Sequence, residues 1–418
     1  MVSVLNNVNK FCLDKIVSLS ENNAVTAAED IYDQNGMKLW AKGGRISPQL
    51  QARLANCKLK TPLELSLEID RSLSMGEVVE DCMKAIYADP ALNRLAGSRA
   101  ALATLSHLRM VKLPSVLRLL LSAPHDKNDK AYRHVLYTIG ICAGFATHAA
   151  LPLSEVEALL AAALLHDLGE MYINPEYLTP GRALAAKEWS AVAAHPKVGY
   201  LVVQEIGKLK EAIGLGVFQH HERLDGSGYP ASLTKERLSK IGAIVAGADA
   251  TAAILKRGGD GAAYQAALAI RLIPEEFDPD MRTFVCAGLR ELAVECSAET
   301  HCLPQTKWVV NKLDRSEAAI EDLLPKSSGK VRGSLVLAKN VCDNVRKAIR
   351  ATGIDYLLQT VSSEQGDDFY SGEVSLVVRE TGWRLRNLAR NIQLLSEMQP
   401  PHEQAALASL IELLEAQQ

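Results

Sequence analysis

The sequence predicts a mainly α-helical protein with a small N-terminal α/β module and a C-terminal helical region. Of its 418 residues, 48% are hydrophobic and only 5% are aromatic. Alanine and leucine dominate the apolar set, and both are strong helix formers. From about residue 75 onward, apolar residues recur at helical spacing between short loops. We expect three regions, because a chain of this length predicts two to three domains: 1–100, 115–300 and 310–418.

The first region, 1–100, carries the α/β module. Residues 24–32 and 37–41 have the pattern of two strands around Asn35-Gly36, a dipeptide typical of tight hairpins because both positions accept a positive φ. Ser47 and Pro48 have the residue types of a helix start, which predicts a short helix over 48–55.

The second region, 115–300, is predicted to be a bundle of helices over 129–147, 187–195, 198–206 and 240–255. Ser154 and Glu157 form a predicted capping box, and the helix that they start ends at His166-Asp167. The third region, 310–418, is predicted to form three or four amphipathic helices. Nothing in the third region has the pattern of a catalytic motif, so we expect it to be dispensable for metal binding.

The charge balance excludes some functions. The formal net charge is −3 and the pI is about 6.4. A protein that binds polymeric nucleic acid or a membrane surface would show a basic face, so neither class is expected. The uncharged stretch 135–154 contains His148 and Pro152, which favours a buried core helix over a membrane span. Eight cysteines without a CxxC pair indicate reduced thiols and a cytoplasmic protein.

Histidines and aspartates at helix ends and turns are the strongest functional signal. Imidazole and carboxylate ligands together suit Fe, Mn, Zn or Ni. A carboxylate has two oxygens and can bridge two ions, so seven such residues fit two metals better than one. The candidate ligands are His134, His166, Asp167, His195, His220, His221 and Asp249.

Each of these residues also has a simpler interpretation. His134 and His195, taken alone, are more often core or surface histidines than ligands. Asp249 lies within an apolar helix, where a carboxylate is costly unless it is paired or bound to metal. The metal-site hypothesis therefore rests on the joint spacing of the set.

Two segments resemble the signatures of a known family. His166-Asp167-Leu168-Gly169 resembles the HD signature of the HD phosphohydrolase superfamily. Residues 220–230, with the sequence HHERLDGSGYP, resemble the HHExxDGxGYP signature of its HD-GYP branch. Pro180-Gly181, His195-Pro196 and Phe277-Asp278-Pro279 match supporting segments in the family's order. The resemblance covers roughly residues 120–295.

This resemblance implies an HD-type helical bundle core that holds two, sometimes three, iron or manganese ions. It implies that His134, His166, Asp167 and Asp249 hold one ion, and that Asp167, His195, His220 and His221 hold the other. Asp167 would be the catalytic metal bridge. The implied activity is hydrolysis of cyclic di-GMP, a cyclic dinucleotide, to the linear dinucleotide and then to GMP. Other signalling proteins are possible partners through the GYP loop at Tyr229 and Pro230.

The sequence departs from the family pattern around the substrate. Glu170 stands where the family usually has a phosphate-binding Lys, and its charge would repel a phosphate. Lys130 stands where a third metal would need a carboxylate, which favours two ions. Arg257, eight residues after Asp249, is a candidate substrate-binding residue.

Three functions therefore remain open. The favoured one is a cyclic-di-GMP phosphodiesterase with altered substrate contacts. The second is a catalytically weak or inactive HD-GYP protein that senses a nucleotide or binds a partner protein. The third is an HD enzyme for another phosphate ester. The sequence sets no oligomeric state.

Overall fold

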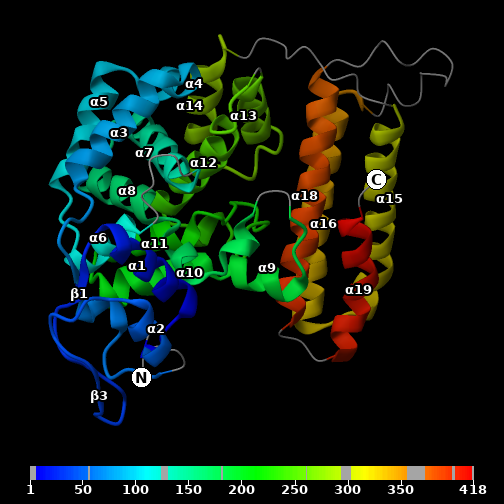
Figure 1. Ribbon diagram of the computed structural model, residues 1–418. Helices are drawn as coiled ribbons and strands as arrows, with labels where there is room; N and C mark the ends of the chain where they lie inside the picture. Colours follow the sequence, from blue (N-terminus) through cyan, green and yellow to red (C-terminus); the bar gives the residue numbers. More distant parts are fainter. Residues whose placement is uncertain are drawn as a thin grey trace. The chain divides into compact units, whose positions relative to one another are not determined.

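The computed structural model describes residues 6–54, 57–123, 130–179, 182–259, 261–292, 303–354, 372–397 and 401–416. Within these residues the fold is mainly helical with four short strands, which confirms the predicted fold class (Figure 1). The chain forms two compact units. The first comprises residues up to 184 together with 191–220 and 239–252, and the second comprises 185–190, 221–238 and residues from 253 onward.

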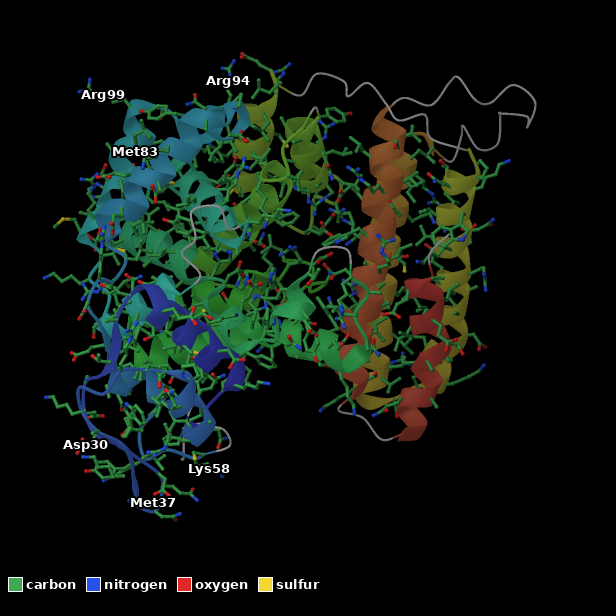
Figure 2. All side chains as sticks on the ribbon, viewed as in Figure 1. Asp30, Met37, Lys58, Met83, Arg94 and Arg99 are labelled. Carbon is green, nitrogen blue, oxygen red and sulfur yellow. The ribbon has the colours of Figure 1, made fainter. Side chains whose placement is uncertain are left out.

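The N-terminal module contains two small antiparallel sheets. Strand β2 (Ile31–Tyr32) pairs with β3 (Lys38–Trp40) around Gly36, whose φ of 86° requires the freedom of glycine. Strand β1 (Val25–Ala27) pairs with β4 (Leu67–Ile69), a partner that the hairpin pattern did not predict. The helices of the module are α1 (Lys10–Asn22), α2 (Pro48–Leu54) and the 3-10 turn η2 (Leu63–Ser66). Figure 2 shows Met37, which is 62% exposed, at the outer tip of the hairpin.

The rest of the first unit is a helical bundle built around α7 and α8. Helix α8 is apolar on nearly all sides, as expected of a helix in the interior of a bundle. Leu159 and Leu160 of α8 and Ile139 and Cys142 of α7 are fully buried. The elements are α3 (Met75–Ala88), α4 (Pro90–Ala96), α5 (Arg99–Ser106), η3 (His107–Met110), α6 (Ser115–Ser122), α7 (Lys130–His148), α8 (Leu153–Leu165), η4 (Leu168–Tyr172), η5 (Pro175–Leu178), α10 (His195–Leu201), the π-turn η6 (Val202–Ile206), α11 (Glu211–Gln219) and α12 (Lys240–Leu255).

One predicted helix start is wrong. Helix α8 begins at Leu153, with Pro152 at the N-cap position and no side-chain cap, so the capping box expected at Ser154 and Glu157 does not form. Proline fits here because it lacks the amide hydrogen that a first turn leaves without a partner. None of the helices in the described part of the chain combines the length and apolar character that a membrane span requires.

The second unit is helical and has its own core. Val331, Leu335 and Val345 of α16 are buried with Leu385 and Leu388 of α18. Its elements are η7 (Lys235–Arg237), α13 (Ala262–Arg271), α14 (Pro279–Leu289), α15 (Leu303–Leu323), η8 (Leu324–Lys326), α16 (Gly329–Ala351), α18 (Gly372–Glu397) and α19 (Pro401–Glu415), with most of α9 (Ala186–Ala193). Cys296, Cys302 and the segment Pro180-Gly181 lie outside the described residues.

Candidate metal centre

Three histidines at helix ends share one local geometry. His166 follows the last residue of α8, His195 opens α10, and His220 follows the last residue of α11. The Nδ1 atom of each lies near the carbonyl oxygen three residues earlier, at Ala163 (2.8 Å), Val192 (2.7 Å) and Val217 (2.7 Å) respectively. A carbonyl oxygen only accepts, so each Nδ1 carries a hydrogen, and in the neutral ring Nε2 then presents a lone pair. This tautomer is the one that a metal-binding histidine needs.

The Nε2 atoms of these histidines converge. Those of His195 and His220 lie 3.0 Å apart, and both side chains are almost fully buried. The side chain of His166 is also fully buried, and its Nε2 atom lies 3.1 Å from a carboxylate oxygen of Asp167. Two buried lone pairs that face each other are unfavourable unless a cation lies between or beside them. The donor set therefore fits a metal ion.

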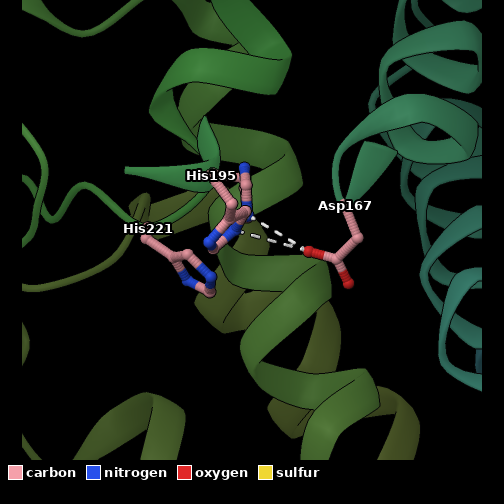
Figure 3. A group of neighbouring side chains, drawn as sticks. Asp167, His195 and His221 are labelled. Carbon is pink, nitrogen blue, oxygen red and sulfur yellow. Dashed lines mark hydrogen bonds and ion pairs between the residues drawn. The ribbon is translucent and has the colours of Figure 1, made fainter. Parts of the chain in front are cut away.

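Asp167 lies between two pairs of histidines. Its Oδ2 atom lies 3.1 Å from Nε2 of His166 and 3.8 Å from Nε2 of His134. Its Oδ1 atom lies 3.5 Å from Nε2 of His220 and 3.6 Å from Nε2 of His195, the contacts drawn as dashed lines in Figure 3. Each oxygen of one carboxylate thus faces a different pair of imidazoles, which is the arrangement of a bridging ligand.

The remaining candidate ligands complete the two groups. Asp249 of α12 is buried, and its Oδ1 atom lies 2.8 Å from Nε2 of His134, a residue 115 positions earlier on α7. His221, the seventh candidate, directly follows His220 in the sequence. Within the first unit the structure therefore brings together six of the seven predicted ligands.

Burial and charge act against each other on these groups. Burial lowers the pKa of the His195 imidazole to about 4, with a further contribution from His220, so this ring is neutral near pH 7. Burial would also lower the pKa of His166, but the carboxylates of Asp167 and Asp249 outweigh it and raise that pKa to about 9. Burial would raise the pKa of Asp167, but the surrounding histidines hold it well below its ordinary value. The carboxylate of Asp167 is therefore ionised and available to a cation.

A glycine determines how closely the segment His166–Gly169 approaches the start of α10 at His195. A Cβ atom on Gly169 would lie 2.0 Å from the carbonyl oxygen of His195, far inside van der Waals contact. Only glycine lets the turn η4 come this close to the start of α10. The sequence shows Gly169 as part of a motif, but its packing role is visible only in the structure.

The departures from the family pattern have different surroundings. Glu170 lies on η4 and is half-buried, and its backbone carbonyl accepts a hydrogen bond from Nζ of Lys15 (2.8 Å). Arg257 lies exposed in the turn after α12. Lys130 is the exposed first described residue of α7.

Residues 222–233, which we call the signature loop, are held together by the side chain of Glu222. The carboxylate of Glu222 is fully buried and accepts from the backbone amides of Ala231 (2.7 Å) and Leu233 (2.9 Å). Gly226 has a φ of 81°, and a Cβ atom on Gly228 would lie 2.4 Å from Cα of Glu222. The charge of Glu222 and the small size of these glycines thus give the loop its shape. The organising role of Glu222 was not predicted from the sequence.

Comparison with known proteins gives one family-model match and several partial relatives. Residues 114–279 match the model of the HD domain. The chain is 32% identical over 183 residues to cyclic di-GMP phosphodiesterase PA4108 of Pseudomonas aeruginosa, covering 41% of this chain and 44% of that protein. It is 36% identical over 104 residues to the cyclic di-GMP phosphodiesterase response regulator RpfG of Xanthomonas campestris pv. campestris, covering 24% and 27% of the two chains.

A third relative is named for a different substrate. The 3′3′-cGAMP-specific phosphodiesterase 3 of Vibrio cholerae is 33% identical over 91 residues, covering 22% of this chain and 20% of that protein. The chain thus spans less than half the length of each of these three relatives.

Proposed function

We propose that this chain, whose residues 114–279 match the HD domain model, is a metal-dependent phosphodiesterase that hydrolyses a cyclic dinucleotide. The observation that carries the proposal is the position of Asp167, with one carboxylate oxygen facing His134 and His166 and the other facing His195 and His220. A carboxylate in an ordinary buried salt bridge faces one basic side chain. The carboxylate of Asp167 instead lies between two pairs of imidazole nitrogens, which are common metal ligands.

The site would hold two divalent ions, with iron or manganese as the proposed metals. His134, His166, Asp167 and Asp249 form one ligand group, and Asp167, His195, His220 and His221 form the other. Mixed imidazole and carboxylate donors suit both metals. When bound, two such cations lower the pKa of a water molecule and neutralise charge that develops on a phosphoryl group.

The residues of the chain supply orientation and a dry environment. Backbone carbonyls fix the ring tautomers of His166, His195 and His220, so their Nε2 atoms face inward without rearrangement. Burial keeps water from competing for these donors, while Asp167, at 19% side-chain exposure, keeps an approach for a substrate phosphate.

The proposed substrate is cyclic di-GMP or a close cyclic dinucleotide such as 3′3′-cGAMP, because relatives named for each of these two activities match this chain. Glu170 and Arg257 are the proposed determinants of substrate contact. The regions 1–100, 115–300 and 310–418 remain our proposed domain division, and the cytoplasm remains the proposed compartment.

A hydrolysis assay tests the proposal. The protein is purified without air, stripped with a chelator, and reloaded separately with Fe²⁺ or Mn²⁺. We expect each reloaded sample to convert cyclic di-GMP or 3′3′-cGAMP to linear dinucleotide or mononucleotide, and the stripped sample to be inactive. A fully loaded protein that binds either nucleotide without cleaving it would replace this proposal with the sensor function.

A further inference from the structure

Helix α18, which lies in the C-terminal region, contacts the signature loop, although nothing in its sequence resembles a catalytic motif. Both belong to the second compact unit. The side-chain amide of Asn391 donates to the backbone carbonyl oxygens of Ser227 and Gly228, the latter at 3.4 Å. Asn391 is 2% exposed, so these hydrogen bonds form away from solvent, where an unpaired carbonyl is costly.

A buried ion pair from the same helix fixes a second point of the loop. Arg384 donates through Nε and Nη2 to both carboxylate oxygens of Glu276, at 2.9 and 2.7 Å. Both side chains are at most 6% exposed. The backbone carbonyl of Glu276 in turn accepts from the amide of Leu224 (3.0 Å), just before the Asp225-Gly226 turn. Planar, bidentate pairing of this kind holds the two segments in one relative geometry.

A stack of side chains links α18 to the ring of His221. The guanidinium of Arg390 lies 5.0 Å from the ring centre of Trp189, and Trp189 meets Tyr229 edge-on at 5.3 Å. Tyr229 stacks on the imidazole of His221 at 4.6 Å with an interplanar angle of 29°, and its amide donates to the carbonyl of His221 (3.1 Å). The aromatic residues Trp189 and Tyr229 thus connect the half-buried Arg390 to a proposed metal ligand.

We propose that α18 is a positioning element of the metal centre: Asn391 fixes the backbone of the signature loop, and Arg390, through Trp189 and Tyr229, fixes the ring of His221. This inference rests on the proposed function, since His221 matters only if the centre binds metal. It gives the C-terminal region, which carries no catalytic motif, a specific role. Asn391 and Arg390 touch neither substrate nor metal, so they are positioning residues.

The test compares Asn391→Asp with Asn387→Asp. Aspartate has the shape of asparagine but cannot donate, so it removes the two loop hydrogen bonds with little change in volume. Asn387 lies one turn earlier on the same helix and is only partly buried, so its substitution controls for the added charge. A second pair compares Arg390→Ala with Arg379→Ala, an exposed position on α18. If Asn391→Asp does not fold, the comparison of Arg390→Ala with Arg379→Ala still tests whether α18 positions the metal centre.

The first readout is hydrogen exchange of the backbone over 221–238 in metal-free protein. We expect exchange of this segment to be about tenfold faster in Asn391→Asp, and unchanged in Asn387→Asp and in helices α7 and α8. The second readout is titration with Co²⁺, whose visible absorption reports coordination. We expect both Asn391→Asp and Arg390→Ala to bind Co²⁺ about 10- to 100-fold more weakly than their control variants.

The outcomes separate this inference from the proposed function. Wild-type exchange over 221–238 and wild-type Co²⁺ affinity in Asn391→Asp and Arg390→Ala would overturn the positioning role. A loaded wild type that cleaves no cyclic dinucleotide, together with faster loop exchange and weaker Co²⁺ binding in the variants, would leave the positioning role standing and remove the hydrolase.

Discussion

The Nε2 atoms of His195 and His220 lie 3.0 Å apart, although the two residues come from different helices and each ring already donates through Nδ1 to a backbone carbonyl. Neither nitrogen of this pair has a hydrogen to offer the other in that tautomer. The contact is favourable only with a shared proton or a cation. Backbone hydrogen bonds of the chain itself therefore orient both rings toward one point, and the predictions below follow from that organisation.

Replacement of His134 should remove one ion and leave the other. His134→Ala deletes a ligand and leaves the buried carboxylate of Asp249 without its 2.8 Å partner. We expect the affinity for one of two ions to fall at least about 100-fold. Elemental analysis after desalting measures the stoichiometry. His148→Ala, at the other end of α7, is the matched control and should keep both ions. Equal metal content in the two variants would contradict the ligand assignment.

Gly169→Ala should destabilise the fold. The new methyl group would meet the carbonyl of His195 at 2.0 Å, so η4 and α10 must separate. Such overpacking typically costs about 1–3 kcal/mol. Chemical denaturation measures the loss. Gly76→Ala on α3 is the control, since its nearest neighbour would be Oγ of Ser74 at 3.8 Å, and it should change stability by less than about 1 kcal/mol.

Glu170→Lys should tighten the binding of a cyclic dinucleotide. A carboxylate a few Å from a phosphate repels it by about 1 to 4 kcal/mol, depending on the effective dielectric, and a Lys attracts it by a similar amount. The dissociation constant of cyclic di-GMP, measured for both proteins at two salt concentrations, tests this expectation. The gain should shrink with added salt if the position is solvent-exposed. Unchanged affinity at low salt would mean that residue 170 does not face the phosphate.

The C-terminal bundle should become more stable as the pH rises above neutrality. The side chain of Lys312 is 3% exposed, and burial, with a contribution from Arg386, lowers its pKa to about 8 from an ordinary value of 10.5. Between these values the unfolded chain binds a proton that the folded chain lacks, so raising the pH favours folding. Lys312→Met should flatten this rise, while Lys330→Met, exposed on α16, should not. Urea unfolding at pH 7 and pH 10 compares them.

The sequence predicts the helical class and a set of candidate metal ligands, because both depend on local patterns. Helical periodicity and the fixed spacing around His166 and His220 are properties of short segments. The pairing of β1 with β4 joins residues about forty positions apart, and the local sequence of neither strand indicates which other strand it pairs with. The capping box at Ser154 failed for a related reason, since Pro152 sets the helix start and the local motif competes with it.

The contacts of α18 were the least predictable part of the site. Asn391 lies more than 160 positions from Ser227, on an amphipathic helix whose pattern indicates only a buried face. The sequence alone does not show that Asn391 is buried, so it gives no reason to assign this asparagine a special role. We therefore no longer expect the C-terminal region to be dispensable for metal binding, because its removal would leave the carbonyls of Ser227 and Gly228 without this donor.

The most direct test of the account is electron paramagnetic resonance of the Mn²⁺-loaded protein and of its Asp167→Asn variant. If Asp167 bridges two ions, the wild type holds about two Mn²⁺ per chain and shows the spectrum of an exchange-coupled pair. The variant should hold at most one ion, or two without coupling, and should lose hydrolysis of the cyclic dinucleotide. A wild type with one isolated Mn²⁺, or an Asp167→Asn variant that keeps a coupled pair and full turnover, would contradict the central claim.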